Sequence, residues 1–157
     1  MECFYEQFQT KDYTKLEKSL NITSKFTLVL LALFLVTLNI TMAIIFIIIY
    51  ALVFIISRNL IVEYEYELTG DELSIYKIMN KSKRKEIGHF SIRDISKVKT
   101  IESTNNNNKI IKAYLEESEH KAMVYMAKTS KGVIGFKLAM DEKLLNIIKK
   151  VNPLAFY

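Results

Sequence analysis

A long stretch without charge constrains this chain more than any other feature. From Phe26 to Ser57 the sequence runs 32 residues without an Asp, Glu, Lys or Arg side chain. About 18 consecutive apolar residues already indicate a transmembrane helix. A secretory signal peptide has an apolar core of only about 7 to 15 residues followed by a small-residue cleavage site, and this stretch does not match that pattern. We therefore expect an integral protein of the cell membrane.

The sequence allows one or two crossings of the membrane. One straight helix of this length would measure roughly 48 Å against a hydrocarbon core of ~30 Å, so a single span would tilt strongly. Two spans, near Asn21–Val36 and Met42–Ser57, would be short at about 16 residues each, with a turn in the polar residues 37–41. No glycine or proline marks that turn, and Asn39 could instead bond to another helix within one span. Basic residues on both flanks favour two spans with both termini cytoplasmic, while one tilted span and a re-entrant segment stay open.

The charge is distributed unevenly about this stretch. Residues 1–25 carry four Lys against four acids, whereas residues 58–157 carry 18 Lys or Arg against 13 acids, so the whole net charge of +5 follows the apolar stretch. A modest positive charge beside a bilayer suits an anionic cytoplasmic leaflet. It is too diffuse to predict a nucleic-acid partner, so the lipid bilayer is the first partner we expect.

The residues before the apolar stretch have helical periodicity. Between residues 4 and 20, aromatic residues and leucines recur mostly three to four positions apart, with charged residues between them. This spacing predicts an amphipathic helix within residues 1–24, ahead of a transmembrane region at 25–58. Such a helix would lie on the bilayer or pack against the rest of the protein.

After Arg58 the hydrophobic residues recur at every second position, as in a β-strand. Hydrophobic residues alternate with Glu63, Glu65 and Glu67, and Thr69-Gly70-Asp71 then predicts the turn of a β-hairpin. The four asparagines of residues 105–108 favour a loop. The expected strands are 62–68, 73–79, 84–90, 95–102, 109–115, 120–128 and 131–140. A final helix, capped by Asp141 and stopped by Pro153, would present an apolar face of Leu144, Leu145, Ile148 and Val151.

Six or seven short antiparallel strands followed by one amphipathic helix outline a PH-like barrel over residues 59–157, with the helix plugging one open end. The segment "NLIVEYEYELTGDELSIYKIMNKSKRK", together with "MDEKLLNIIKKVNP" and "FYEQF", resembles an uncharacterised family of bacterial membrane proteins with an N-terminal transmembrane hairpin and a PH-like domain. This resemblance implies an architecture but no catalytic or binding residue. The expected fold is thus an α+β membrane protein, a transmembrane helical hairpin followed by a PH-like antiparallel β-barrel with a C-terminal helix.

The sequence offers little for catalysis. His89 and His120 are the only histidines, they stand on different expected strands, and Cys3 is the only cysteine, so we expect no metal site and no disulfide. No nucleophile elbow or phosphate-binding glycine loop is present. The three alternating glutamates are interpreted as a solvated strand face. We expect no catalytic residue and no cofactor, with a hydrolase as a minor alternative.

A basic cluster is the one suggestive site. Lys81, Lys83, Arg84 and Lys85 lie in and after a predicted hairpin turn, where they could contact anionic lipid headgroups or simply form a solvated turn. The leading hypothesis is a non-enzymatic interaction module at the cytoplasmic face of the membrane that binds a protein partner or a second copy of itself. The alternative is recognition of anionic lipid through this basic cluster.

Overall fold

The computed structural model describes residues 4–101, 109–130 and 132–157, apart from the side chain of Arg58. Cys3, Lys131 and the predicted asparagine loop lie outside the described residues. The chain divides into two compact units. The β-unit comprises Met1–Lys11, Glu63–Ile78 and Lys83–Tyr157, and the helical unit comprises Asp12–Val62 and Met79–Ser82.

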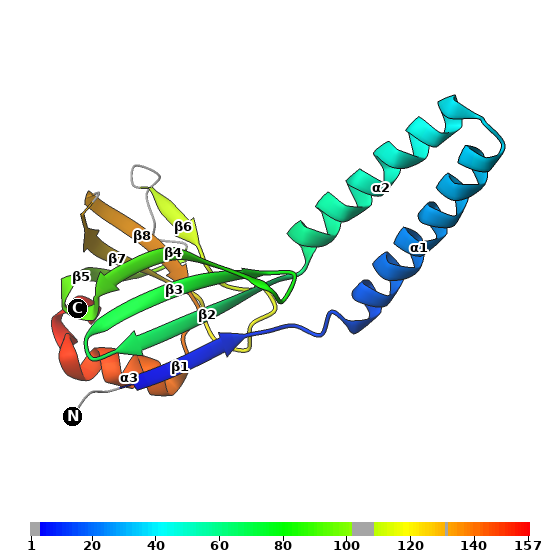
Figure 1. The fold of residues 1–157 in the computed structure, drawn as a ribbon. Coiled ribbons are helices and arrows are strands. Elements are labelled where there is room, and N and C mark those ends of the chain that lie inside the picture. The colour runs from blue at the N-terminus through cyan, green and yellow to red at the C-terminus, as the bar shows by residue number, and fades with distance from the viewer. Residues whose placement is uncertain (1–3, 102–108, 131) are drawn as a thin grey trace. The chain divides into compact units, whose positions relative to one another are not determined.

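The helical unit contains two helices joined by a tight turn (Figure 1). Helix α1 spans Thr14–Val36 and helix α2 spans Ile40–Leu60. Leu38 adopts a left-handed φ of 55° in the turn, and the Asn39 side chain accepts a hydrogen bond of 3.2 Å from the backbone N–H of Met42. The predicted helical pair and its polar turn are therefore confirmed, and an asparagine cap replaces the missing glycine or proline. Both helices are long and apolar enough to cross a membrane.

The two helices pack along a seam with coiled-coil spacing. The less exposed side chains alternate three and four residues apart on each helix, as knobs-into-holes packing requires. On α1 the seam includes Leu20, Ser24, Thr27, Leu31 and Phe34, and on α2 it includes Ala43, Phe46, Tyr50, Val53 and Ser57. The other faces of α2 are exposed and apolar, so this helix is hydrophobic all round.

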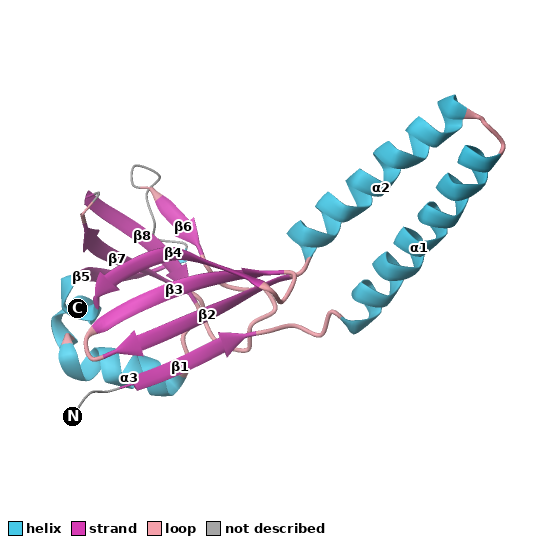
Figure 2. Cartoon of the chain, viewed as in Figure 1, coloured by secondary structure: helices cyan, strands magenta, loops and turns pink. Residues whose placement is uncertain are grey.

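The β-unit begins with a four-stranded sheet in the order β1-β2-β3-β4 (Figure 2). The strands are β1 Phe4–Gln9, β2 Val62–Thr69, β3 Glu72–Met79 and β4 Lys83–Ser91. The hairpin of β2 and β3 turns at Gly70, whose φ of 65° suits glycine. The sequence prediction for these three later strands is confirmed to within two residues at each end.

The prediction of an amphipathic helix over residues 4–20 is wrong in its first half, because Phe4–Gln9 form strand β1. This strand pairs antiparallel with β2, from Phe4 opposite Thr69 to Gln9 opposite Tyr64. Aromatic residues four apart fit a period of two as well as a helical period. The strand partner lies beyond both helices in the chain, and local periodicity carries no information about so distant a partner.

The second sheet has the order β5-β7-β8-β6. Its strands are β5 Ile95–Thr100, β6 Ile110–Lys112, β7 Met123–Thr129 and β8 Gly132–Leu138. Strand β7 pairs antiparallel with β5 and β8, but β6 pairs parallel with β8, with Ile110 opposite Gly135. The predicted all-antiparallel arrangement is therefore wrong at β6, which is also shorter than expected.

The two sheets do not close into a barrel, which corrects the predicted closed architecture. The 3-10 turn η1, Ile92–Asp94, separates β4 from β5, so these consecutive strands fall in different sheets. Their inner faces still share a core. The largest fully buried side chains include Tyr66, Tyr125, Phe136, Leu68, Leu73 and Ile75.

A C-terminal helix, α3 Glu142–Val151, packs against η1 and the final 3-10 turn η3, Pro153–Phe156. Its predicted cap is confirmed, since Asp141 Oδ1 accepts a 2.7 Å hydrogen bond from the N–H of Leu144. Leu144 and Ile148 are fully buried. Val151, which we expected on the same buried face, is 41% exposed.

Candidate functional site

One seam between the two sheets is closed by side chains from β1. Gln7 Nε2 donates to the carbonyl of Ala139 at 3.1 Å, and Gln7 Oε1 accepts from the N–H of Asp141 at 2.9 Å. Gln9 donates to the same Ala139 carbonyl and accepts from the N–H of Leu115 at 3.2 Å. Both glutamines are 5% exposed. Buried amides thus replace the missing strand pairing at this seam, because backbone groups there need partners.

Tyr5 adds a third contact at the closed seam. Its hydroxyl donates to the Asp141 carboxylate, and the Lys143 ammonium lies 4.6 Å from the centre of its ring. The hydrogen bond to Asp141, burial and the nearby negative charge raise the pKa of Tyr5 to about 12. Since β1 also pairs with β2, this N-terminal strand is held on two sides.

Beside β4, no strand pairing joins the two sheets among the described residues, and this seam forms the candidate site. A groove of about 450 Å³ lies between β4 and the second sheet, within the range of about 300–1,000 Å³ typical of ligand pockets. Its base is apolar, since Ile134 and Phe136 line it and are at most 7% exposed. Its other lining residues are Glu86, Ile87, Gly88 and His89 of β4, Lys109 just before β6, Ile111 in β6, Thr129 at the end of β7 and Ser130 in the turn that follows.

Two edge strands border this groove. Strand β4 is the last of the first sheet and β6 the last of the second, and within the described part of the chain no strand pairs with their outer edges. Gly88 lets β4 approach the base, because a Cβ atom there would lie 2.4 Å from Cε1 of Phe136. Phe136 also stacks on Phe90 with the ring centres 4.9 Å apart. The groove therefore combines free strand edges with a rigid apolar base.

The residues of the predicted basic cluster have different partners in the structure. Lys81 belongs to the helical unit, where its Nζ lies 2.5 Å from the Glu17 carboxylate. Arg84 belongs to the β-unit and bonds both Glu65 and Glu67 at 2.6 Å. Lys83 and Lys85 are exposed, and no ion pair is found for either among the described residues. Two of the four predicted contacts are thus already engaged by carboxylates.

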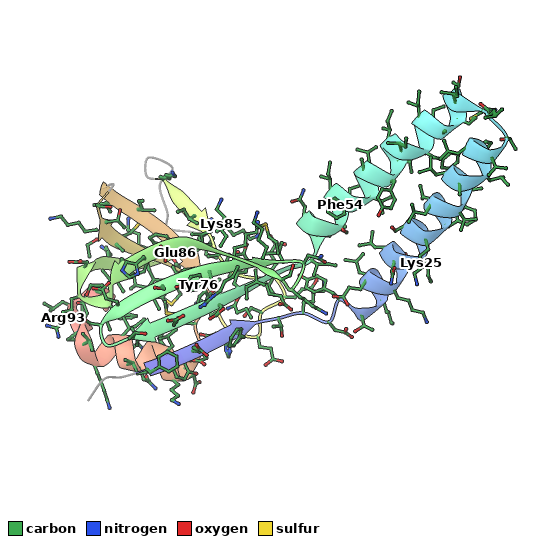
Figure 3. All side chains as sticks on the ribbon, in the orientation of Figure 1. Lys25, Phe54, Tyr76, Lys85, Glu86 and Arg93 are labelled. Atoms are coloured by element: carbon green, nitrogen blue, oxygen red, sulfur yellow. The ribbon has the colours of Figure 1, made fainter. Side chains whose placement is uncertain are left out.

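The interpretation of the glutamates as a solvated face is wrong for Glu65, which is 4% exposed. Phe8 stands opposite it in the strand register, and the Arg84 guanidinium stacks 3.7 Å from the ring centre of Tyr76, which Figure 3 labels. Burial raises the pKa of Glu65, and the charge of Arg84 opposes that shift. The sequence could not reveal this arrangement because β1 supplies the cover.

Oxygen atoms of Glu6, Glu65 and Glu67 lie within 4.8 Å of one another, a grouping that could in principle hold a cation. Arg84 already compensates two of these carboxylates, so the charge of the group is partly balanced by the protein itself. Cross-strand pairing opposes Glu6 to Glu67, and such like-charged neighbours repel.

The two histidines stand apart, as the sequence predicted. His89 Nδ1 lies 2.9 Å from Ser74 Oγ, and its Nε2 lies 3.3 Å from a carboxylate oxygen of Glu72. His120 lines a different depression of about 280 Å³, together with Phe8, Lys11 and others. His89 is one of the residues that line the groove of the candidate site.

Comparison with known proteins gives one match. A family model described as a bacterial PH-like domain (DUF6106) matches residues 1–157. No curated protein and no solved structure matches the chain.

Proposed function

Because this chain belongs to the family of bacterial PH-like domains, we propose that it is a membrane-anchored, non-enzymatic interaction module. The helical unit anchors the chain, and the open groove of the β-unit binds an extended segment of a partner protein at the cytoplasmic face. The single observation that carries the binding role is the groove with its two free strand edges.

The surface of the helical unit supports the membrane anchor. Ile44, Ile48 and Leu52 on α2 are each at least 52% exposed, although water disfavours such surface. A helix that is apolar on every face must be covered by protein or by lipid. Little of the two candidate spans is buried by the rest of the described chain, which leaves lipid as the solvent that suits them.

The strand register supports two crossings. Strands β1 and β2 pair directly, yet α1 and α2 lie between them in the chain. A single tilted span would place β1 and β2 on opposite sides of a bilayer and forbid their pairing. A hairpin returns the chain to the side from which it left. Lysines on both flanks then favour the cytoplasm for that side.

The chemistry of the groove supports strand addition. A partner segment in extended conformation can bond the free backbone groups of an edge strand and place alternate side chains on an apolar base. Among the described residues the groove's ionisable groups are Glu86, His89 and Lys109, contributed by different elements. Recognition of anionic lipid by the basic cluster has less support, since Lys81 and Arg84 are each paired with carboxylates.

Site-specific photocrosslinking tests the groove. A photoreactive residue replaces Ile111 in the groove, and a matched one replaces Ile147 on α3, in full-length protein within bacterial membranes. We expect one discrete crosslinked protein from Ile111 and none from Ile147. Ser130→Trp, which obstructs the groove, should abolish that product, while Ser118→Trp in the other depression should leave it unchanged. Equal crosslinking from both positions, or a product insensitive to Ser130→Trp, would contradict the proposal.

A further inference from the structure

The side chains in the seam between α1 and α2 change from large and aromatic at one end to small and polar at the other. In the half nearest the turn, Phe34 and Phe46 stack with their ring centres 5.3 Å apart. In the half nearest the strands, the seam carries the small polar residues Ser24 and Ser57. These side chains cannot fill the space that phenylalanines fill at the other end, and a cavity of about 270 Å³ lies there.

The cavity is lined by both polar and apolar side chains. Glu17, Asn21 and Ser24 line it at four- and three-residue spacing, which places them on one face of α1. Ser57 lines it from α2, donating its hydroxyl hydrogen to the Phe54 carbonyl at 2.9 Å and keeping its oxygen as an acceptor. The remaining lining residues are Leu20, Val53, Phe54, Ile61 and Asn80.

An ion pair brings a positive charge next to Glu17, the one ionisable residue among the described residues that line the cavity. Glu17 lines it, and the Lys81 Nζ lies 2.5 Å from the Glu17 carboxylate. The Glu17 side chain is 36% exposed and the Lys81 side chain 50% exposed, so both charges are accessible to a ligand. A ligand that fits this pair carries a cation and an anion a short distance apart.

The position of the cavity along the helices indicates where that ligand comes from. The cavity lies at the end where the chain leaves β1 and enters β2, beside the last charged residue of α1, Lys25. Lys25 and Phe54, labelled in Figure 3, lie in this half of the two helices. In a membrane hairpin this is the depth at which lipid headgroups meet acyl chains.

We propose that this cavity binds the headgroup of a glycerophospholipid that carries a primary ammonium beside its phosphate. The ammonium approaches Glu17 and the phosphate approaches Lys81, while the glycerol end lies against Val53 and Phe54. The inference rests on the membrane placement in the proposed function. It assigns to the helical unit a lipid selectivity in which Lys81 is the one member of the basic cluster that takes part.

Native mass spectrometry of the full-length protein in detergent tests the lipid class. The protein is incubated with phosphatidylethanolamine, phosphatidylcholine and phosphatidylglycerol in equal amounts. We expect one retained ethanolamine lipid per chain, in about tenfold excess over the other two, because choline lacks N–H donors and glycerol lacks the cation. Equal retention of all three lipids, or preference for the anionic one, would overturn the proposal.

Four variants test the cavity, two inside it and one matched control outside it for each. Ser24→Leu fills the seam with an apolar side chain, whereas Thr23→Leu makes the same kind of change at an exposed neighbour. We expect Ser24→Leu to remove the ethanolamine preference and Thr23→Leu to keep it. Glu17→Gln, which leaves the seam packing unchanged, should also remove the preference, with Glu119→Gln as its charge-matched control. Preference that survives Glu17→Gln contradicts the assignment.

The experiments distinguish failure of the lipid proposal from failure of the proposed function. If the groove does not crosslink a partner but the ethanolamine preference holds, only the binding role is lost. If the protein is released from membranes by alkaline carbonate, the anchor itself is wrong and the lipid proposal fails with it.

Discussion

At the scale of single residues, two buried tyrosines show how differently a hydroxyl can be accommodated. The Tyr66 hydroxyl donates to the Ala113 carbonyl at 2.5 Å and accepts from the N–H of Ala139 at 3.3 Å. The Tyr125 hydroxyl is equally buried and has no hydrogen-bond partner among the described residues. Burial raises the pKa of both phenols, so both stay protonated at physiological pH. The two side chains therefore make a matched pair for mutation.

Tyr66→Phe should lower the free energy of unfolding of the β-unit by about 2 kcal/mol, because it leaves two buried backbone groups without partners. Tyr125→Phe should leave stability unchanged or raise it by up to about 1 kcal/mol, since it removes only an unpaired hydroxyl. Urea unfolding of the full chain in micelles, followed by near-ultraviolet circular dichroism, measures both. A larger loss from Tyr125→Phe than from Tyr66→Phe would show that this hydroxyl has a partner.

Arg84 is expected to stabilise the first sheet rather than to bind a ligand. Arg84→Gln leaves the buried Glu65 carboxylate without its cation, so stability at pH 7 should fall by about 1–2 kcal/mol, a value reduced for the partial exposure of Arg84. The pKa of Glu65 is already raised, so the folded state binds its proton more tightly than the unfolded state. The loss of stability caused by Arg84→Gln should therefore become smaller as the pH falls toward 4.5, the ordinary pKa of a glutamate side chain.

The same unfolding measurement, made in a series of buffers, checks this dependence. Adding Glu65→Gln to Arg84→Gln should restore most of the stability at pH 7, because the unpaired buried charge is gone. A penalty that is constant with pH, or unaffected by Glu65→Gln, would mean that Arg84 contributes through its packing on Tyr76.

At the scale of elements, β1 is the strand on which the β-unit depends most. It covers the edge of β2, and its glutamines close one seam between the sheets. A fragment of residues 59–157 lacks β1 and so exposes an edge strand and unpaired backbone groups. Both consequences favour aggregation over folding.

Replacing the helices by a short linker tests this dependence. Gln9 stands opposite Tyr64 in an antiparallel pair, so the ends of β1 and β2 are close enough for a flexible loop of about four residues. Residues 4–10 joined through such a linker to residues 62–157 should give a soluble monomer with cooperative unfolding. The fragment 59–157 should aggregate or unfold without cooperativity. Equal behaviour in size-exclusion chromatography and thermal unfolding would show that β1 is dispensable.

At the scale of the whole molecule, the proposed membrane anchor would couple topology to folding through the pairing of β1 with β2. Under the proposed membrane placement, the chain can form this sheet only when both ends of the helical unit lie on one side of the bilayer. Insertion as a hairpin would then be a condition for completing the β-unit. A chain that crossed once would keep β1 and β2 apart.

Cysteine labelling with a membrane-impermeant maleimide tests this topology in intact and lysed cells. The native Cys3 and an introduced Lys121→Cys should react only after lysis. Leu38→Cys, at the exposed turn between the helices, should react in intact cells. The introduced cysteines are placed in a Cys3→Ser background. Labelling of Cys3 and Lys121→Cys on opposite sides would rule out the hairpin and the pairing of β1 with β2 in the membrane.

The sequence by itself determined the local elements of this protein. The uncharged stretch, the alternation after Arg58 and the Asp141 cap each depend on neighbours within a few residues, and each is found in the structure. Short-range periodicity and capping are properties of consecutive side chains, so they are readable without the fold.

Only the tertiary structure decided which distant elements meet. It paired Phe4–Gln9 with a strand beyond the two helices, set β6 parallel to β8 and left the seam at β4 open. It also paired Lys81 with Glu17 and Arg84 with Glu65. These outcomes depend on contacts between residues far apart in the chain. Alternative pairings of distant strands compete, and the free energy of the whole fold decides between them. The candidate groove was therefore invisible in the sequence, because each of its walls is an ordinary strand.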